Sequence, residues 1–226
     1  MYAMKLTRRN AEAYFSNELP KSGGRSKIRE QATDIRQKAI LDAALKCFVD
    51  RGYLDTTIEH IRTASAASIG SIYHHFADKQ VIAATLYLRT LEGAQSAALG
   101  LLHRKRTAAS GISALIKSYI DWVGENPLQA HFLINSRHLE FTLEIEPAVT
   151  ALNLAFLESF RQWARPHVAA KTLPRIDDHC FPVLFGPCEY WARRWLSGPR
   201  DNSALTKARG RLAAAAYPAI LANLKK

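Results

Sequence analysis

Apolar side chains between residues 33 and 89 recur at helical spacing, and polar or glycine positions divide them into separate helices. Thr33 and Asp34 are a suitable start for the first helix, because an aspartate in the first turn is favourable there. Gly52 is the expected stop, with Tyr53 placed to pack back on the helix end. The apolar face that this helix presents consists of Ile35, Ala39, Ile40, Ala43, Ala44, Cys47 and Phe48.

Two short helices and the start of a further helix are predicted next. In "TTIE", Thr56 is the expected N-cap and Glu59 completes a capping box. Residues 65–67 form the turn, Ser68 caps the following helix, and Asp78 caps the one after it. Two short helices that are joined by a tight turn and packed on a longer helix form a helix-turn-helix, so the pattern predicts this motif.

Residues 35–85 resemble the DNA-binding domain of the tetracycline-repressor (TetR-type) family of bacterial transcriptional regulators. The resemblance rests on "ILDAALKCFVDRGYLDTTIEHI", on the "S-x-G-S-I-Y-H-H-F" run from Ser68, and on "DKQVI" from Asp78. The sequence departs from the family at Ala66, where glycine is usual, and at Arg62, where a small residue is common. Alanine with a positive φ is strained by roughly 1 kcal/mol, so we expect a slightly remodelled turn. Arg62 is expected to add a surface charge near the DNA.

The resemblance makes the helix after Ser68 a recognition helix, which must approach base edges and phosphates closely. Gly70 and Ser71 have small side chains, so the first turn of the helix can come close to DNA. The N-terminal amides of a helix favour phosphate oxygens. Its tyrosine and histidines can donate to phosphates, whereas Ile69 can touch a thymine methyl group. The helix holds no Arg, Asn or Gln, so we expect poor direct reading of guanine and adenine. The predicted DNA-binding residues are Thr57, which rests on the resemblance, Ser68, Ile69, Gly70, Ser71, Tyr73, His74, His75 and Lys79, with packing against the first helix as the alternative for His75.

Residues 1–32 show no sustained hydrophobic periodicity and are predicted to form a basic, flexible N-terminal arm. Lys21, Arg25, Lys27 and Arg29 lie within nine positions of one another. Such an arm can follow the DNA backbone or enter a minor groove, or it can be a solvated leader, and the sequence leaves both interpretations open.

The rest of the chain continues in helical patterns, and no stretch alternates with the period of two that strands require. We therefore expect an all-α protein, with the helix-turn-helix domain at 33–80 and a second helical domain at 81–226. The family resemblance implies that this second domain binds a small-molecule effector and forms a homodimer through its last two long helices.

The effector pocket and the dimer seam have no short motif, so their residues are predicted from side-chain type and helical spacing. Apolar cavities with a few polar groups suit small ligands, and ordinary core packing is the alternative for these residues. The predicted pocket residues are Trp122, His131, Phe132, His138, Phe156 and Phe160. The predicted seam consists of Leu184, Cys188, Trp191 and Trp195, for which an intramolecular core stripe is the alternative.

The formal net charge of +11 favours an anionic partner, nucleic acid above all. The net charge is +5 for residues 1–38, −1 for 39–85 and +7 for 86–226. The predicted helix-turn-helix therefore does not carry the excess of positive charge. Three cysteines without metal spacing fit a reducing cytoplasm. The sequence shows no apolar run of membrane length and no secretory signal, so we expect a cytoplasmic protein without membrane contact.

These features together predict a ligand-responsive transcriptional regulator, most simply a repressor that a small molecule releases from a near-palindromic operator. Its expected partners are double-stranded operator DNA, an unidentified small-molecule effector and a second copy of the chain. We find no phosphate-binding glycine loop, metal motif or nucleophile signature, so no catalytic residue, metal or cofactor is predicted. The alternatives are a DNA-packaging protein without an effector and, with less support, an all-α enzyme.

Overall fold

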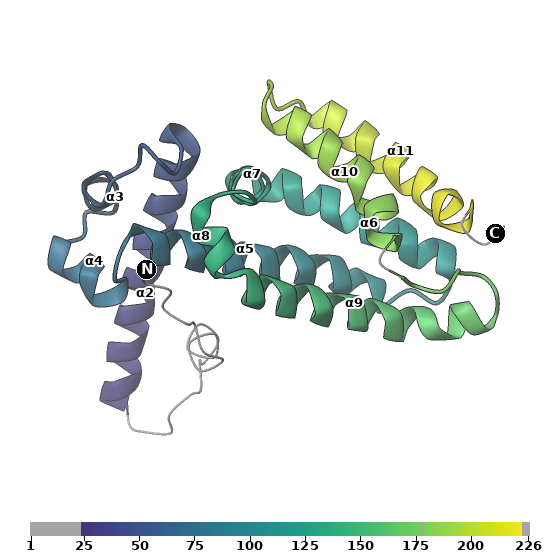
Figure 1. Cartoon of the computed structure of the whole chain (residues 1–226), viewed down its shortest axis with the longest axis horizontal. Helices are drawn as coiled ribbons and strands as arrows, with labels where there is room; N and C mark the ends of the chain where they lie inside the picture. Colours follow the sequence, from purple (N-terminus) through teal and green to yellow (C-terminus); the bar gives the residue numbers. More distant parts are fainter. Residues whose placement is uncertain (1–23, 178, 223–226) are drawn as a thin grey trace. The chain divides into compact units, whose positions relative to one another are not determined.

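The computed structural model describes residues 24–177 and 179–222, apart from the side chains of 24–30 (Figure 1). No β-strand occurs in these ranges, and the regular structure consists of α-helices, which confirms the expected all-α class. The predicted arm before residue 24 lies outside the described residues, as do the side chains of Arg25, Lys27 and Arg29. No helix in the described ranges combines the length and the apolar character that crossing a membrane requires.

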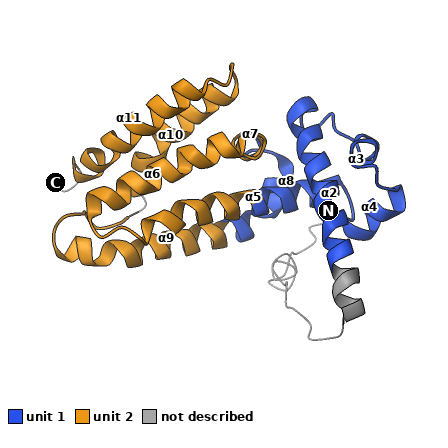
Figure 2. Cartoon of the chain, turned by 180° about the vertical axis from the view of Figure 1, so that it is seen from behind, with its two compact units in different colours: residues 1–89, 135–149 blue, residues 90–134, 150–226 orange. Residues whose placement is uncertain are grey.

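The chain divides into two compact units (Figure 2). The first unit contains the chain up to residue 89 together with 135–149, and the second contains 90–134 and 150–226. Because segment 135–149 belongs to the first unit, this unit is discontinuous in sequence, which helical spacing alone did not indicate.

The helices of the first unit are α2 (Gly24–Arg51), α3 (Ile58–Ser65), α4 (Ile69–His75), the first part of α5 (Lys79–Leu102), and α8 (Glu140–Glu144). Helix α2 begins at Gly24, earlier than the expected start at Thr33 and Asp34. Lys, Arg, Glu, Gln and Ala predominate ahead of Thr33, and these residues favour a helix without needing an apolar face. Ile35, which was expected on the apolar face, is 70% exposed.

Helices α2, α3 and α4 bury one apolar side chain after another against a common core. From α2, Ile40 and Ala44 are fully buried. Ile61 of α3 and Ile72 of α4 are also 0% exposed, and Ile82 of α5 completes the set. Burying a side chain of this size stabilises a fold by about 1.5–3 kcal/mol, so these contacts fix the two short helices on the longer one.

The second unit is built around α6 (Ala108–Glu125), which packs along α11 (Asn202–Leu221) and contacts α10 (Cys180–Leu196). The remaining helices are α7 (Pro127–Asn135), whose last residue falls in the first unit, and α9 (Glu146–Ala169), which enters the second unit at residue 150. Helix α6 is buried on most sides, with Ile112, Leu115, Ile116 and Ile120 each 0% exposed. An isoleucine- and leucine-rich helix of this kind belongs in a core rather than on a surface.

A close approach joins α6 to α9. Gly111 faces the ring of Trp163, and a Cβ atom at this position would overlap the ring. The ring is held in place because Trp163 Nε1 donates to the carbonyl of Lys105 at 3.1 Å. Glycine at 111 therefore lets the two helices pack more closely than any other residue would allow.

The predicted dimer seam on α10 lies inside the second unit. Leu184 and Cys188 are 1% exposed and Trp195 is 7% exposed within the single chain. Trp191 packs partly buried against the same core and stacks on Trp195 with ring centroids 5.9 Å apart. Leu184, Cys188 and Trp195 thus pack inside the single chain, which supports the alternative of an intramolecular core stripe. Periodicity alone cannot separate these two uses of an apolar face, because both require it.

Candidate nucleic-acid interface

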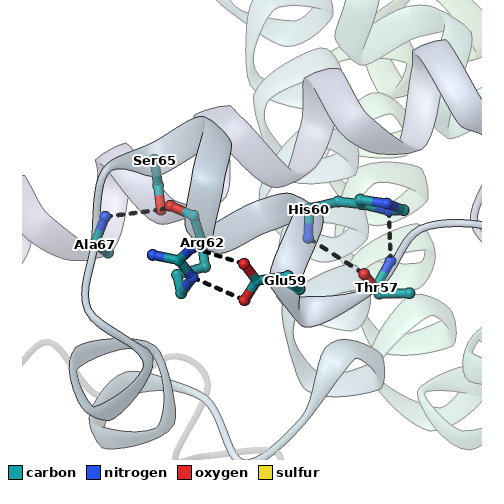
Figure 3. Close-up of polar contacts among 6 residues, drawn as sticks. All are labelled: Thr57, Glu59, His60, Arg62, Ser65 and Ala67. Atoms are coloured by element: carbon teal, nitrogen blue, oxygen red, sulfur yellow. Dashed lines mark hydrogen bonds and ion pairs between the residues drawn. The ribbon is translucent and has the colours of Figure 1, made fainter.

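Helix α3 begins with a capping box that is shifted by one residue from the expected one (Figure 3). Thr57 is the N-cap, and its Oγ1 accepts a hydrogen bond from the His60 amide at 3.2 Å. In return the Thr57 amide donates to His60 Nδ1 at 3.2 Å, so the imidazole takes the place that Glu or Gln usually fills. Because Nδ1 accepts, the neutral His60 ring carries its proton on Nε2.

Thr56, which was expected to be the N-cap, is instead fully buried. Its Oγ1 lies 2.7 Å from the carbonyl oxygen of Gly52 and 3.1 Å from that of Cys47. The hydroxyl group therefore ties the loop back to the end of α2. Two adjacent threonines can both serve as caps in a sequence, and burial of the first one decides which does.

Glu59 forms an ion pair on the surface of α3. Arg62 donates to it through both Nε and Nη2, at 2.7 and 2.6 Å (Figure 3). The hydrogen bonds from Arg62 lower the pKa of Glu59, and the same bonds raise the pKa of Arg62. The positive charge that Arg62 was expected to add near DNA is thus paired with a carboxylate three residues away.

The turn between α3 and α4 keeps the geometry that favours glycine. Ala66 is the C-cap of α3, with φ of 51° and ψ of 25°, in the left-handed region. Ser65 supports the turn, since its hydroxyl accepts from the Ala67 amide at 3.3 Å (Figure 3). Ala67 is 3% exposed and anchors the turn in the core. The turn is therefore not remodelled to relieve Ala66, and the strain remains.

The N-terminal turn of helix α4 is exposed to solvent, and its side chains are uncharged, with Gly70 and Ser71 among the smallest residues. Ser68 is its N-cap and accepts from the Ser71 amide at 3.1 Å. Gly70 is exposed, and no atom lies within 4 Å of the position where a Cβ would stand. Ile69 and Tyr73 are 47% and 53% exposed, although side chains of this type are usually buried.

The two histidines at the end of α4 differ in environment. His74 is exposed, whereas His75 is partly buried. Burial lowers the pKa of His75, and the neighbouring His74 and Arg36 of α2 lower it further. The neutral form of His75 is favoured beside α2, which supports the alternative in which this ring packs against the first helix.

Lys79 was predicted to contact a phosphate, and the structure gives its ammonium group other partners. Lys79 Nζ donates to the carbonyl oxygens of Tyr53 at 2.8 Å, Leu54 at 3.2 Å and Thr56 at 2.7 Å. It also lies 4.5 Å from the centroid of the Tyr53 ring. Burial lowers the pKa of Lys79, with a smaller opposing effect of Asp55. All three ammonium hydrogens have acceptors in the loop, so a phosphate contact would require these bonds to be given up.

Sequence reasoning missed the aromatic support of this loop. Tyr53 packs against Phe48 and Phe141, with ring centroids 5.6 and 5.0 Å apart. Phe141 belongs to segment 135–149, is 0% exposed, and also contacts Tyr87 at 6.2 Å between centroids. The "GY" pair at 52–53 indicated a helix end, but no local signal linked it to a phenylalanine 88 positions away.

The predicted effector residues lie in several different environments. Trp122 and Phe132 are 9% and 3% exposed, and His131 is half-buried in the second unit. His138 is exposed and belongs to the first unit. The other two belong to an aromatic cluster in the second unit, in which Phe156 contacts Phe181 at 5.3 Å and Phe160 contacts Phe181 at 5.8 Å between ring centroids. In the part of the chain that the structure describes, no three His, Cys, Asp or Glu side chains are grouped as metal ligands.

The helix-turn-helix geometry agrees with the comparison to known families. Residues 40–86 match the family described as bacterial regulatory proteins, tetR family. The helix-turn-helix segment of this chain is thus of the tetR-family type. The match covers the helix-turn-helix and parts of its supporting helices, which are the parts of the chain that the sequence motifs also identified.

Curated tetR-family relatives match over the same part of the chain. The HTH-type transcriptional repressor Rv1474c of Mycobacterium tuberculosis is 38% identical over 56 residues, which is 25% of this chain and 30% of that repressor. The HTH-type transcriptional repressor AcnR of Corynebacterium glutamicum is 39% identical over 51 residues, which is 23% of this chain and 27% of AcnR. The chain thus spans less than a third of the length of these relatives where it matches them.

Solved tetR-family structures share the fold over most of the chain. A TetR family transcription regulator from Marinobacter aquaeolei has a TM-score of 0.67 at 18% identity, covering 84% of this chain and 98% of that one. The regulator FadR from Bacillus subtilis, solved in complex with stearoyl-CoA, has a TM-score of 0.68 at 14% identity, covering 81% and 98%. At this identity the likeness establishes the fold of both units, not what they bind.

Replacing Ala66 with glycine is expected to stabilise this protein. Glycine removes the left-handed strain, so Ala66→Gly should raise the free energy of unfolding by about 1 kcal/mol. Ala64→Gly, inside α3, is the matched control and should lower it by about 0.5–1 kcal/mol. Urea denaturation followed by circular dichroism measures both. Equal losses in the two variants would show that the turn does not strain Ala66.

Replacing Lys79 with methionine separates its role in the loop from a phosphate contact. Lys79→Met keeps the long apolar stem but leaves three carbonyls without their donor, so the free energy of unfolding should fall by about 1–3 kcal/mol. Lys46→Met, at an exposed position on α2, is the control and should change it by less than about 0.5 kcal/mol. Unchanged stability, with a loss of about 0.9 from the slope of log affinity against log salt, would favour the phosphate contact instead.

Proposed function

We propose that the chain is a DNA-binding transcriptional regulator that uses α4 as its recognition helix. The observation that carries this proposal is the exposed, capped and uncharged start of α4, where Ile69 and Tyr73 stand in solvent on a rigidly packed helix. A helix of this kind can enter a major groove because the small side chains of Gly70 and Ser71 let its first turn approach the bases. We favour a repressor, since the curated relatives that match over this region are repressors.

The proposed contacts divide into two kinds. Ile69 and Ser71 would face base edges, where an isoleucine suits a thymine methyl group and a hydroxyl suits several bases. Thr57, Tyr73 and His74 are exposed and would contact phosphates, together with the free amides at the start of α4. Ser68 is occupied as an N-cap and would act by holding these amides in place.

The test is a selection of bound sequences from a random duplex library with the purified full chain. We expect a near-palindromic site with two half-sites in successive major grooves, because a two-fold dimer presents two recognition helices. Ile69→Ala should relax the preference at one position in each half-site, whereas Ile35→Ala, at another exposed isoleucine on α2, should leave the preference unchanged. A short asymmetric site, or no enrichment at all, would contradict the proposal.

Tyr73→Phe provides the complementary measurement on phosphate contacts. Removing one hydroxyl donor should weaken binding to specific and random duplexes alike, by about three- to tenfold. Titration of both duplexes at several salt concentrations measures this loss. If Tyr73→Phe altered the sequence preference and left the affinity for random DNA unchanged, Tyr73 would read bases instead.

We also propose a homodimer, formed by the solvent face of α10 and α11 rather than by the buried stripe of α10. Tyr190 is 67% exposed on this face, which is unusual for a large side chain. Gly186 of α10 and Gly210 of α11 are exposed and have no atom within 4 Å of a Cβ position. Small residues on adjacent helices allow the helices of a second copy to approach closely.

Tyr190→Asp should give a folded monomer that no longer binds its operator. The charge would be unpaired in an interface of more than about 1,000 Å², but it stays in water in the single chain. Leu184→Asp is the contrasting variant and should unfold the chain, because Leu184 is 1% exposed within it. Sedimentation and circular dichroism on the same samples separate these outcomes. A Tyr190→Asp protein that stays dimeric would reject this face.

The second unit is proposed to bind the effector among its partly buried aromatic side chains. Tyr119 and Phe185 contact each other with centroids 5.6 Å apart, and Phe156 lies 6.2 Å from Phe185. Partly buried rings can separate to admit an apolar ligand at less cost than a closed aliphatic core. The solved complex of Bacillus subtilis FadR with stearoyl-CoA, which has the same fold, supports a small-molecule ligand for this chain. This arrangement favours an effector-controlled regulator over a DNA-packaging protein or an enzyme.

A further inference from the structure

A groove of about 920 Å³ lies between the C-terminal half of α9 and the loop that leads into α10. Three arginines line it, Arg161 and Arg165 from α9 and Arg175 from the loop. Its apolar lining comes from small and branched side chains, Val168, Ala169 and Ile176. None of the predicted effector residues lines this groove, so it is a separate feature of the second unit.

The walls of the groove are fixed before any ligand arrives. Ile176 is 6% exposed and accepts a hydrogen bond at its carbonyl from Arg161 Nε at 3.3 Å, which ties the loop to α9. The amides of Thr172 and Leu173 both donate to the carbonyl of His167, at 2.9 and 3.2 Å. Leu173 is 1% exposed and anchors the middle of the loop. A loop held in this way positions its arginine without a further loss of backbone entropy on binding.

The groove carries a small excess of positive charge. Within the described ranges, none of the three guanidinium groups forms an ion pair with a carboxylate. Asp177 also lines the groove, but its Oδ1 accepts from the His179 amide at 3.0 Å and lies 3.4 Å from Cys180 Sγ. This carboxylate is therefore engaged at the start of α10. Glu158 is the other acidic side chain in the lining, so arginines outnumber carboxylates there.

We propose that this groove binds a small molecule that carries a phosphate or pyrophosphate group on an apolar body. Guanidinium groups remain charged at any physiological pH and present planar pairs of donors that match phosphate oxygens. Arginines that come from a helix and from a fixed loop can hold different oxygens of one anion. The apolar lining accommodates the uncharged part of the ligand, and the volume is in the usual range for small-molecule sites.

A small molecule fits this site better than the DNA backbone does. Specific protein–DNA interfaces cover roughly 1,000–2,500 Å² of protein surface and follow an extended duplex. The three arginines instead line one concave site within 15 positions of the sequence. The inference rests on the second unit alone and does not require the proposed DNA-binding activity.

The test is calorimetric titration of the purified full chain with pyrophosphate, without DNA. We expect saturable binding that weakens about tenfold or more in Arg165→Gln and in Arg175→Gln, since each variant removes a charged donor pair. Arg104→Gln, at an exposed arginine outside the groove, should bind within about twofold of the unaltered protein. Both groove arginines are exposed, so these variants are expected to fold, and circular dichroism verifies it.

Two further titrations test the proposal. Sodium sulfate at matched ionic strength controls for screening, and a phosphate ester with an alkyl chain should bind more tightly than pyrophosphate because it also covers the apolar lining. No binding by the unaltered protein, or equal losses in all three arginine variants, would overturn the proposal. So would variants that lose affinity for random duplex DNA and keep their affinity for pyrophosphate, because the arginines would then belong to the DNA surface.

Discussion

The arrangement of α3 and α4 in the first unit depends on how the loop between α2 and α3 is held. Three backbone carbonyls of this loop converge on the ammonium group of Lys79, which donates a hydrogen bond to each of them. Without such a donor the carbonyls would lose their hydrogen bonds beside the partly buried Tyr53 ring, at a cost of about 1–3 kcal/mol. Thr57 follows directly, so the position of the α3 N-cap is set by the same interaction. Helix α4 packs on α3, so its position depends on the same loop.

The sequence predicted the helix-turn-helix well because its signals are local. Capping residues, a glycine stop and apolar spacing of three and four act within a few positions, and the structure confirms the order of α2, α3 and α4. The shift of the N-cap from Thr56 to Thr57 shows the limit of such signals. Either threonine satisfies the capping rule, and only the burial of Thr56 against the end of α2 decides between them. The exchange of Glu59 for His60 in the capping box follows from this shift of one position.

The features that the sequence did not predict depend on contacts between distant positions. Phe141 supports Tyr53 from a segment that lies far along the chain, and nothing near either residue indicates the pair. The stripe of Leu184, Cys188 and Trp195 is a different case, because its periodicity is real and these side chains pack within their own chain. A helix that packs on its own chain and one that packs on a second copy both present an apolar face. The exposed Tyr190, on another face of α10, could be recognised only once burial within the single chain was known.

The distribution of charge has a simpler explanation when the two units are considered separately. Residues 39–85 have a net charge of −1, and within them Arg62 is paired with Glu59 and Lys79 is bonded to the loop. A helix-turn-helix of this charge gains little from long-range attraction to DNA, so the proposed binding relies on short contacts by Ile69, Tyr73 and the helix amides. Residues 86–226 carry a net charge of +7, and this charge lies outside the helix-turn-helix. Three of the arginines in this range line one groove and form no ion pair within the described residues, and the anionic ligand that we propose there accounts for this arrangement better than a general attraction to nucleic acid does.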